Sequence, residues 1–185
     1  MFTIGHGNRT LAEFLALLRA HGITRLVDVR AYPRSRHNPA YDLDALPPAL
    51  AAEGIAHTHL RELGGRRRAR PDSINLAWRN EAFRGYADHM HTDAFHAGLD
   101  RLLALAAADR VAIMCAETVP WRCHRSLIAD ALVARGVPVL DILGDGAPRP
   151  HALPPHARVH DGEVSYPAPE LFPASGGAAA PPGDA

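Results

Sequence analysis

Short apolar segments alternate with amphipathic segments of helical periodicity along this chain, and that alternation restricts its fold more than any other feature. Five segments have the length and apolar content of buried strands, and they cover residues 2–4, 24–29, 55–60, 110–115 and 137–142. Helices are predicted over residues 11–21, 44–53, 80–91, 92–108 and 123–135, the third and fourth being two helices or one broken helix. The pattern predicts an α/β fold, a single domain with a mostly parallel five-stranded sheet and helices on both faces.

The predicted α/β domain covers residues 1–145, and the composition changes after it. A capping-box sequence at Thr10 opens the first helix. Residues 146–166 form a predicted C-terminal extension, in which an Asp-Gly turn at Asp161 indicates a small hairpin. Residues 167–185 are rich in proline, alanine and glycine, and we expect them to be a disordered tail.

The composition excludes several classes of protein. At 185 residues and 47% hydrophobic residues, the chain has the size and apolar content of one globular domain. Its apolar runs are too short to span a membrane, and its first residues lack the features of a signal peptide. We therefore expect a cytoplasmic protein without membrane association, in which Cys115 and Cys123 are reduced thiols.

The charge is balanced overall but unevenly distributed. All 20 basic residues are arginines, which excludes lysine-based covalent chemistry. Six acidic residues and two arginines follow residue 140, so the region before it carries the excess of positive charge. Many of these arginines lie in a basic loop from Arg61 to Arg70, which is either a solvated surface or a phosphate contact. The loop supports one alternative function, that of a nucleic-acid-associated protein.

Reactive side chains follow four of the five predicted strands. In chain order they are His6, Asp28 and Arg30, His57 or His59, and Cys115 with Glu117. Ligands of parallel α/β sheets bind outside the carboxyl ends of the strands, so we expect an active site at this edge.

The segment from Cys115 to Arg125 carries the richest chemistry in the chain, since it joins a predicted strand to a predicted helix. We expect Cys115 to be a nucleophilic thiolate, favoured by the helix N-terminus and by Arg125, although a buried inert thiol has the same sequence pattern. Glu117 or His6 would then move protons. Cys123 and His124 are further catalytic candidates, Cys123 as a thiol that resolves an oxidised Cys115.

Arginines near the predicted site favour an anionic substrate. Arg30 and Arg125 are expected to converge on a phosphate or carboxylate, with Asp28 orienting a neighbouring side chain and Arg122 lying in the same loop. A metal site is the alternative for the sulfur-rich segment, built from Cys115, Cys123, His124 and His6. No other cofactor is predicted.

Several motifs together resemble one protein family. They are the stretches at residues 3–6, 27–30, 33–35, 63–65 and 114–125, the last running from Met-Cys-Ala-Glu to Cys-His-Arg. The chain resembles domain of unknown function family 488 (DUF488) from about residue 1 to residue 145. The resemblance implies a bacterial-type α/β protein without an assigned reaction, and it adds Ser35, Gly64 and Gly65 to the candidate anion-binding residues. A Gly-His-Gly sequence at His6 departs from the family's Gly-His-Ser.

A weaker likeness is to rhodanese-type domains, in which an Asp-Val-Arg strand end pairs with a cysteine loop that closes on Arg-Ser. Asp28 to Arg30 and the segment from Cys115 to Ser126 share this arrangement, but the loop here is longer and lacks glycine. The favoured hypothesis is therefore a thiol-dependent transferase or hydrolase that acts on a small phosphate-, sulfur- or carboxylate-bearing substrate.

Overall fold

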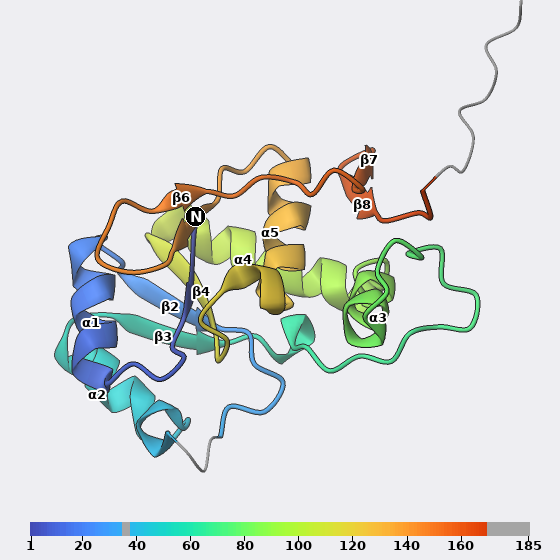
Figure 1. Cartoon of the computed structure of the whole chain (residues 1–185). Helices are drawn as coiled ribbons and strands as arrows, with labels where there is room; N and C mark the ends of the chain where they lie inside the picture. The colour runs from blue at the N-terminus through green and yellow to red at the C-terminus, as the bar shows by residue number, and fades with distance from the viewer. Residues whose placement is uncertain (35–37, 170–185) are drawn as a thin grey trace, which may run out of the picture.

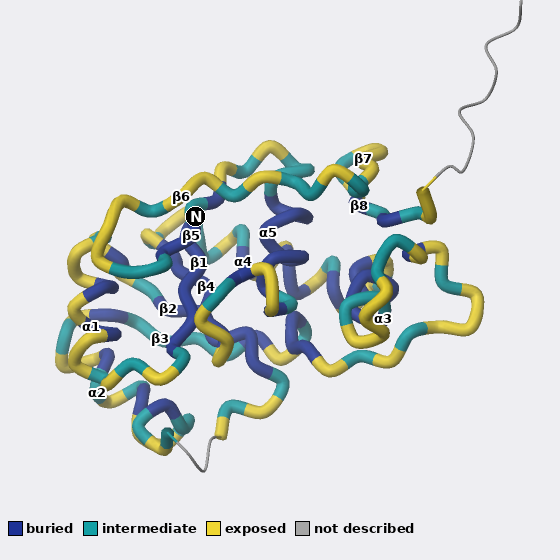
Figure 2. Tube along the Cα trace, in the orientation of Figure 1, coloured by how far each residue is buried: buried dark blue, intermediate teal, exposed yellow. Residues whose placement is uncertain are grey.

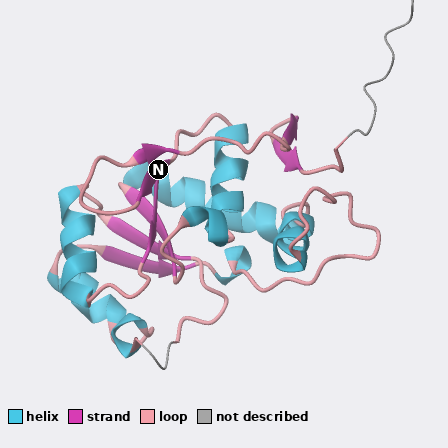
Figure 3. Ribbon diagram, in the orientation of Figure 1, coloured by secondary structure: helices cyan, strands magenta, loops and turns pink. Residues whose placement is uncertain are grey.

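A computed structural model describes residues 1–34 and 38–169, and it shows a six-stranded sheet between two layers of helices (Figures 1 and 3). The strand order across the sheet is β3-β2-β4-β1-β5-β6. The strands are β1 (Phe2–Gly5), β2 (Arg25–Asp28), β3 (Ala56–His59), β4 (Val111–Cys115), β5 (Leu140–Ile142) and β6 (Arg149–Pro150). The first five are parallel to one another, so their carboxyl ends lie at one edge.

The helices divide between the two faces of this sheet. One face is covered by α1 (Leu11–Ala20) and α2 (Leu46–Ala52). The other is covered by α4 (Asp93–Ala108) and α5 (Arg125–Ala134), with α3 (Glu81–His89) packed beside them. Three short 3-10 helices are η1 (Pro39–Tyr41), η2 (Arg61–Leu63) and η3 (Pro120–Arg122). The predicted fold class and the helices on both faces are confirmed.

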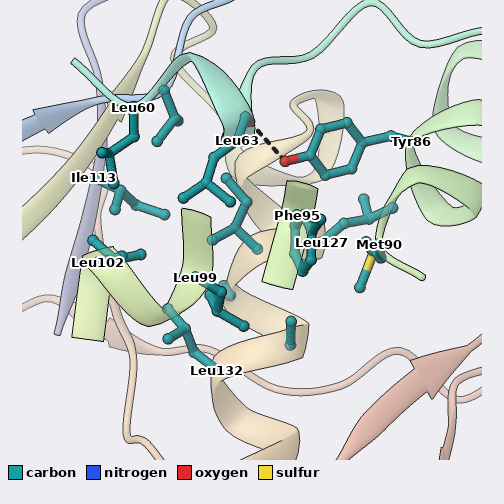
Figure 4. Packing of buried hydrophobic residues seen from close by; sticks show 14 of the residues in the cluster. Leu60, Leu63, Tyr86, Met90, Phe95, Leu99, Leu102, Ile113, Leu127 and Leu132 are labelled. Carbon is teal, nitrogen blue, oxygen red and sulfur yellow. Dashed lines mark hydrogen bonds between the residues drawn. The ribbon is translucent and has the colours of Figure 1, made fainter. Parts of the chain in front are cut away.

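Alternation along β4 shows why the sheet is buried on both faces. Val111, Ile113 and Cys115 contact the cluster formed with α3, α4 and α5, whereas Ala112 and Met114 contact the cluster formed with α1 and α2. Figure 2 shows β1, β2 and β4 as mostly buried, whereas β3 is intermediate and the edge strand β6 is exposed. Figure 4 shows the first cluster, in which leucines of α4 and α5 pack together below Tyr86.

Side-chain caps fix the helix boundaries. At α1 the predicted capping box is present, since Thr10 accepts from the backbone N–H of Glu13 and the Glu13 carboxylate accepts from that of Thr10. The predicted helical region over residues 80–108 is two helices, because Thr92 caps α4 through the N–H of Phe95 after α3 has ended at His89. None of the helices in the described ranges is long and apolar enough to cross a membrane.

The C-terminal extension departs from the predicted sheet in one respect. The sheet has six strands where five were predicted, because Arg149–Pro150 pairs antiparallel with β5 as an edge strand. Two residues, one of them proline, give no strand signal in a sequence, although proline is tolerated at a sheet edge. The predicted hairpin is present as β7 (Arg158–His160) and β8 (Glu163–Ser165), and its turn residues Asp161 and Gly162 have φ angles of 50° and 78°. Most of the predicted tail, residues 170–185, lies outside the described residues.

A buried polar group attaches this extension to the sheet and to α5. His151 contacts Asp130 of α5 at 2.8 Å through Nε2 and Asp141 of β5 at 3.1 Å through Nδ1. Tyr166 Oη donates to the second oxygen of Asp130, and Thr3 Oγ1 donates to Asp141. Although burial opposes protonation, the hydrogen bonds and charges of the two carboxylates raise the pKa of His151 to about 9. The imidazolium is thus the form that connects the two carboxylates.

Replacing His151 tests this connection. The folded protein holds the His151 proton up to about pH 9, whereas an unfolded chain releases it near pH 6.5. The resulting stability is complete below pH 6.5 and is lost as the pH rises to about 9. We expect His151→Gln to lower the free energy of unfolding by roughly 1–3 kcal/mol below pH 6.5, and by less at higher pH. Urea denaturation across this range, with the exposed His160→Gln as control, measures the difference. A constant difference between His151→Gln and the wild type would contradict it.

Candidate functional site

A cavity of about 280 Å³ opens at the carboxyl edge of the sheet. The ends of β1, β2 and β4, the loop before η1, the loop after η2 and the start of α5 all contribute to it. Its lining residues are His6, Arg30, Ala31, Tyr32, Arg34, Gly65, Arg66, Cys115, Ala116, Glu117 and His124. The structure therefore brings together six of the residues selected from the sequence: His6, Arg30, Gly65, Cys115, Glu117 and His124.

Cys115 is the last residue of β4 and is 8% exposed. A hydrogen bond from the Cys123 thiol lowers the pKa of Cys115 to about 7 against the opposing effect of burial. The backbone amides of Glu117 and Ala116 and the positive charge of Arg125 act in the same direction. Cys115 is thus ionised more readily near neutral pH than an ordinary thiol.

Cys123 has the opposite character. Because it donates to Cys115 and is buried, its pKa is raised to about 12, and it keeps its proton. His124 Nδ1 lies 3.8 Å from each sulfur. Its Nε2 lies 2.8 Å from the carbonyl oxygen of Val29, which can only accept, so Nε2–H donates and Nδ1 faces the two sulfurs. Cys115 is therefore the more acidic thiol of the pair, and Cys123 is the protonated thiol that donates a hydrogen bond to it.

The loop between β4 and α5, residues 116–124, is here called the site loop, and Arg125 holds its first part in place. The Arg125 guanidinium is fully buried and donates to the carbonyl oxygens of Glu117 and Thr118, the latter at 2.7 Å. These bonds orient the loop so that its amides face Cys115. The sequence predicts that Arg125 binds the anion. In the structure its side chain bonds the site loop and is not among the residues that line the cavity.

The site loop also passes very close to β1. A Cβ atom at Gly5 would lie 1.7 Å from the carbonyl oxygen of Glu117, so only glycine fits there. The amides of His6 and Gly7 then donate to the carbonyls of Cys115 and Ala116 at 3.0 and 2.8 Å. Close packing therefore requires glycine at the first position of the Gly-His-Gly sequence.

Asp28 and Arg30 form a buried ion pair, with 0% and 5% side-chain exposure. The Arg30 guanidinium bonds both carboxylate oxygens of Asp28 and also donates to the Tyr41 carbonyl at 2.6 Å. Arg30 lines the cavity, but its charge is matched by Asp28. Asp28 thus orients Arg30, one of the roles expected from the sequence.

His6 stacks on the Tyr41 ring, with 4.1 Å between ring centroids. Its Nδ1 contacts the Gly7 carbonyl at 3.0 Å, and its Nε2 is buried without a partner among the described residues. Burial is the main cause that lowers the pKa of His6, so the neutral ring prevails at neutral pH. A neutral ring that donates through Nδ1 leaves Nε2 available to accept a proton.

The cavity mouth is formed by residues that sequence analysis did not select individually. Arg66 lies with its guanidinium 5.5 Å from the centre of the exposed Tyr32 ring. Arg66 has a φ of 61°, an unfavourable conformation for a residue with a side chain. Arg34 also lines the mouth, and its only ion pair in the described part is an exposed one of 3.3 Å with Asp44. Arg66 belongs to the basic loop, which the sequence predicts to be a solvated surface or a phosphate contact, whereas the only signal for Arg34 was its position in the loop after β2.

The remaining candidates lie around the cavity in different ways. Gly65 allows the loop after η2 to approach His124, since a Cβ there would lie 2.8 Å from its Nδ1. Gly64 is packed against Ala31 in the same way. Arg122 is exposed outside the cavity lining, and Ser35 lies outside the described residues. Within the basic loop, Arg67 donates to the Gly64 carbonyl and Arg70 donates to the Asp72 carboxylate. Arg66 is the arginine of this loop that lines the cavity.

Three residues of the site could hold a metal ion. The ligand atoms of Cys115, Cys123 and His124 all lie within 4.8 Å of one another, and His6 does not belong to this group. Two thiolates and an imidazole suit a thiophilic ion such as Zn²⁺. The Val29 carbonyl accepts a hydrogen bond from the far ring nitrogen of His124 and so fixes the ring orientation, as such partners do for metal-bound histidines. Three protein ligands would leave a fourth position for a water or a substrate.

Comparison with known proteins gives one match. The family model described as domain of unknown function DUF488 matches residues 10–132. No curated protein and no solved structure matches the chain. The resemblance predicted from the sequence motifs is confirmed.

The hydrogen bond from Cys123 can be tested by the pH dependence of Cys115 alkylation. We expect half-maximal reactivity of wild-type Cys115 near pH 7. Cys123→Ala removes the donor and should raise this midpoint by roughly one unit, whereas Cys123→Ser keeps a hydroxyl donor and should raise it less. Iodoacetamide labelling resolved by peptide mass gives both midpoints. Equal midpoints in Cys123→Ala and the wild type would exclude this role of Cys123.

Proposed function

Because the chain belongs to the DUF488 family, whose description assigns no reaction, we propose its function from the site: a thiol-dependent enzyme in which Cys115 attacks a small anionic substrate. The proposal depends on one observation. The Cys115 sulfur lies at the wall of the cavity and receives hydrogen bonds from a neighbouring thiol and two backbone amides. An inert core cysteine has no need for three donors, since its thiol packs as an apolar group.

The charges around the cavity support an anion as the substrate. Arg34 and Arg66 lie at the mouth, and Glu117 is the acidic residue on the lining. Arg30 contributes little net charge because Asp28 neutralises it. Arg66 has no ion-pair partner among the described residues, so its forked donors are available for a phosphate, sulfur oxyanion or carboxylate. A volume of about 280 Å³ suits a small molecule.

The reaction class that fits these residues is group transfer through a covalent intermediate. The Cys115 thiolate forms a bond to the electrophilic atom of the substrate, and the leaving group departs with the bonding electrons. An acceptor, either water or a second thiol, then takes the group from Cys115. Glu117, exposed on the cavity lining, is suited to remove the proton of this acceptor, and His6 Nε2 is the other base on the lining. The likeness to rhodanese-type domains supports sulfur or phosphoryl transfer within this class.

A metal centre is a second candidate function, favoured by the close grouping of Cys115, Cys123 and His124. An ion bound there would occupy both sulfurs and would protect Cys115 from alkylation. Labelling before and after treatment with a chelator therefore distinguishes the two. Rapid labelling without a chelator supports the nucleophile, whereas labelling that requires the chelator supports the metal.

The anion preference of the cavity is tested with two reagents of similar size. Iodoacetate carries a negative charge and iodoacetamide does not, so their rate ratio at Cys115 reports the local positive potential. We expect Arg66→Ala to slow iodoacetate by roughly fivefold and to leave iodoacetamide nearly unchanged. Arg122→Ala removes an exposed arginine outside the cavity lining and is the matched control.

Phosphate and sulfate provide an independent measurement on the same protein. Either anion should slow labelling of the wild type and protect Arg66→Ala less. If Arg66→Ala and Arg122→Ala lose iodoacetate reactivity equally, the effect comes from the overall charge of the protein and not from an anion site at Arg66. Failure of both anions to protect would leave an anionic substrate without support.

A further inference from the structure

The two thiols of the chain lie close together but differ in their access to the cavity. The ligand atoms of Cys115, Cys123 and His124 lie within 4.8 Å of one another, and both cysteines are free. Cys115 belongs to the lining of the cavity of about 280 Å³, whereas Cys123 is 3% exposed and is not among the lining residues. A small molecule in the cavity therefore reaches the sulfur of Cys115 and leaves that of Cys123 to react within the protein.

The folded chain holds Cys123 beside Cys115. The N–H of Cys123 donates to the Pro120 carbonyl at 2.9 Å, and its carbonyl accepts from the N–H and the Oγ of Ser126 at 3.0 and 2.9 Å. Cys115 ends β4, which lies between β1 and β2 in the sheet. A disulfide requires the two sulfurs to approach further by side-chain rotation. Because folding has already brought the two residues together, this bond closes no new loop of flexible chain.

His124 places one ring nitrogen next to both sulfurs. Its Nδ1 lies 3.8 Å from each sulfur, while its Nε2 donates to the Val29 carbonyl at 2.8 Å. Because Nε2 is committed to a carbonyl, Nδ1 is the ring nitrogen that can exchange a proton with a thiol. The Cys123 thiol donates its hydrogen bond to Cys115 as long as Cys115 is a thiolate. Oxidation of Cys115 removes that acceptor and leaves His124 Nδ1 beside the Cys123 thiol.

We propose that the Cys115–Cys123 pair reduces small hydroperoxides by cycling between two thiols and a disulfide. The Cys115 thiolate attacks one oxygen of the peroxide, the O–O bond breaks, and the departing oxygen takes a proton from solvent and leaves as water or an alcohol. Cys115 is then a sulfenic acid. The Cys123 thiol gives its proton to His124 Nδ1 and attacks the Cys115 sulfur. The S–S bond forms as the S–O bond breaks, and the hydroxide takes the proton from His124 and leaves as water.

A dithiol reductant completes the cycle. It returns the disulfide to two thiols and is itself oxidised to a disulfide, so it supplies both electrons that reduce the peroxide. This activity rests on the proposed function in one respect, because it requires Cys115 to be the reactive thiolate of the cavity. It adds a substrate class, the hydroperoxide, and gives Cys123 a part in the reaction.

Oxidation by hydrogen peroxide tests the proposal, because the two cysteines fall in different peptides. Cleavage after arginine places Cys115 in residues 111–122 and Cys123 in residues 123–125. We expect one equivalent of peroxide to link these two peptides in the wild type, and dithiothreitol to separate them again. Mass spectrometry identifies the linked pair, which is lighter than the two separate peptides by two hydrogen atoms.

Matched variants separate the two steps of the oxidation. In Cys123→Ser the first step proceeds and the second is blocked, so Cys115 accumulates as a sulfenic acid that dimedone traps. Cys115→Ser should give neither product. His124→Gln keeps an amide N–H for the Val29 carbonyl but lacks the ring Nδ1. It should slow disulfide closure at least roughly tenfold relative to sulfenic acid formation in the same protein. The exposed His160→Gln is its control and should close the disulfide at the wild-type rate.

Three results would overturn the proposal. The first is oxidation of wild-type Cys115 to a sulfenic acid or a higher oxide without linked peptides. The second is linkage only after treatment with a chelator, because a metal ion on both sulfurs would then describe the native protein. The third is faster linkage by oxidised glutathione than by hydrogen peroxide, which would make a disulfide the substrate.

Iodoacetamide labelling of Cys115 in the same preparation separates this activity from the proposed function. Rapid labelling without peroxide-linked peptides overturns the hydroperoxide activity and leaves Cys115 as a nucleophile. Absence of labelling with and without a chelator overturns both.

Discussion

The buried Arg125 guanidinium is the interaction on which the arrangement of the site depends. It donates to two carbonyls of the site loop and also contacts Thr3 Oγ1 at 3.3 Å. Thr3 continues the chain of hydrogen bonds to Asp141, and His151 connects Asp141 to Asp130. One buried polar network thus connects the loop beside Cys115 with the C-terminal extension. Buried charges are tolerated here because each one is paired or fully hydrogen-bonded.

The site loop contributes to two cavities, one of about 280 Å³ beside Cys115 and one of about 240 Å³ beside Trp121. Arg34 and Arg66 line the cavity on the Cys115 side, and the Asp130–His151–Asp141 group lines the other. Ala116 and Glu117 of this loop line the first cavity, and Pro120 and Trp121 line the second. Arg125 holds the loop between them through hydrogen bonds to the carbonyls of Glu117 and Thr118. One short loop therefore shapes both cavities.

The two cysteines show how one loop produces two different thiols. Cys115 ends a strand, where the first two amides of the loop reach its sulfur, and it receives a hydrogen bond from Cys123. Cys123 donates that bond and is buried, so its pKa rises while that of Cys115 falls. The difference comes from hydrogen-bond direction, because both thiols are buried to a similar degree. His124 adds a ring nitrogen, Nδ1, that lies 3.8 Å from both sulfurs.

Hydrophobic periodicity by itself determined the α/β class, the five parallel strands and the position of Cys115, His6 and Asp28 at one edge, because strand ends follow from local pattern and parallel ends must coincide. The same local information predicted the capping box at Thr10 and the Asp161-Gly162 turn, and the structure confirms both. It could not show that Arg125 is turned inward to the loop carbonyls while Arg66 lines the cavity, since an arginine has the same local signal in either role. Nor could it find the edge strand at residues 149–150 or the partners of His151, which lie 10 and 21 residues away along the chain. Those contacts depend on how distant segments pack, and only the tertiary structure decided them.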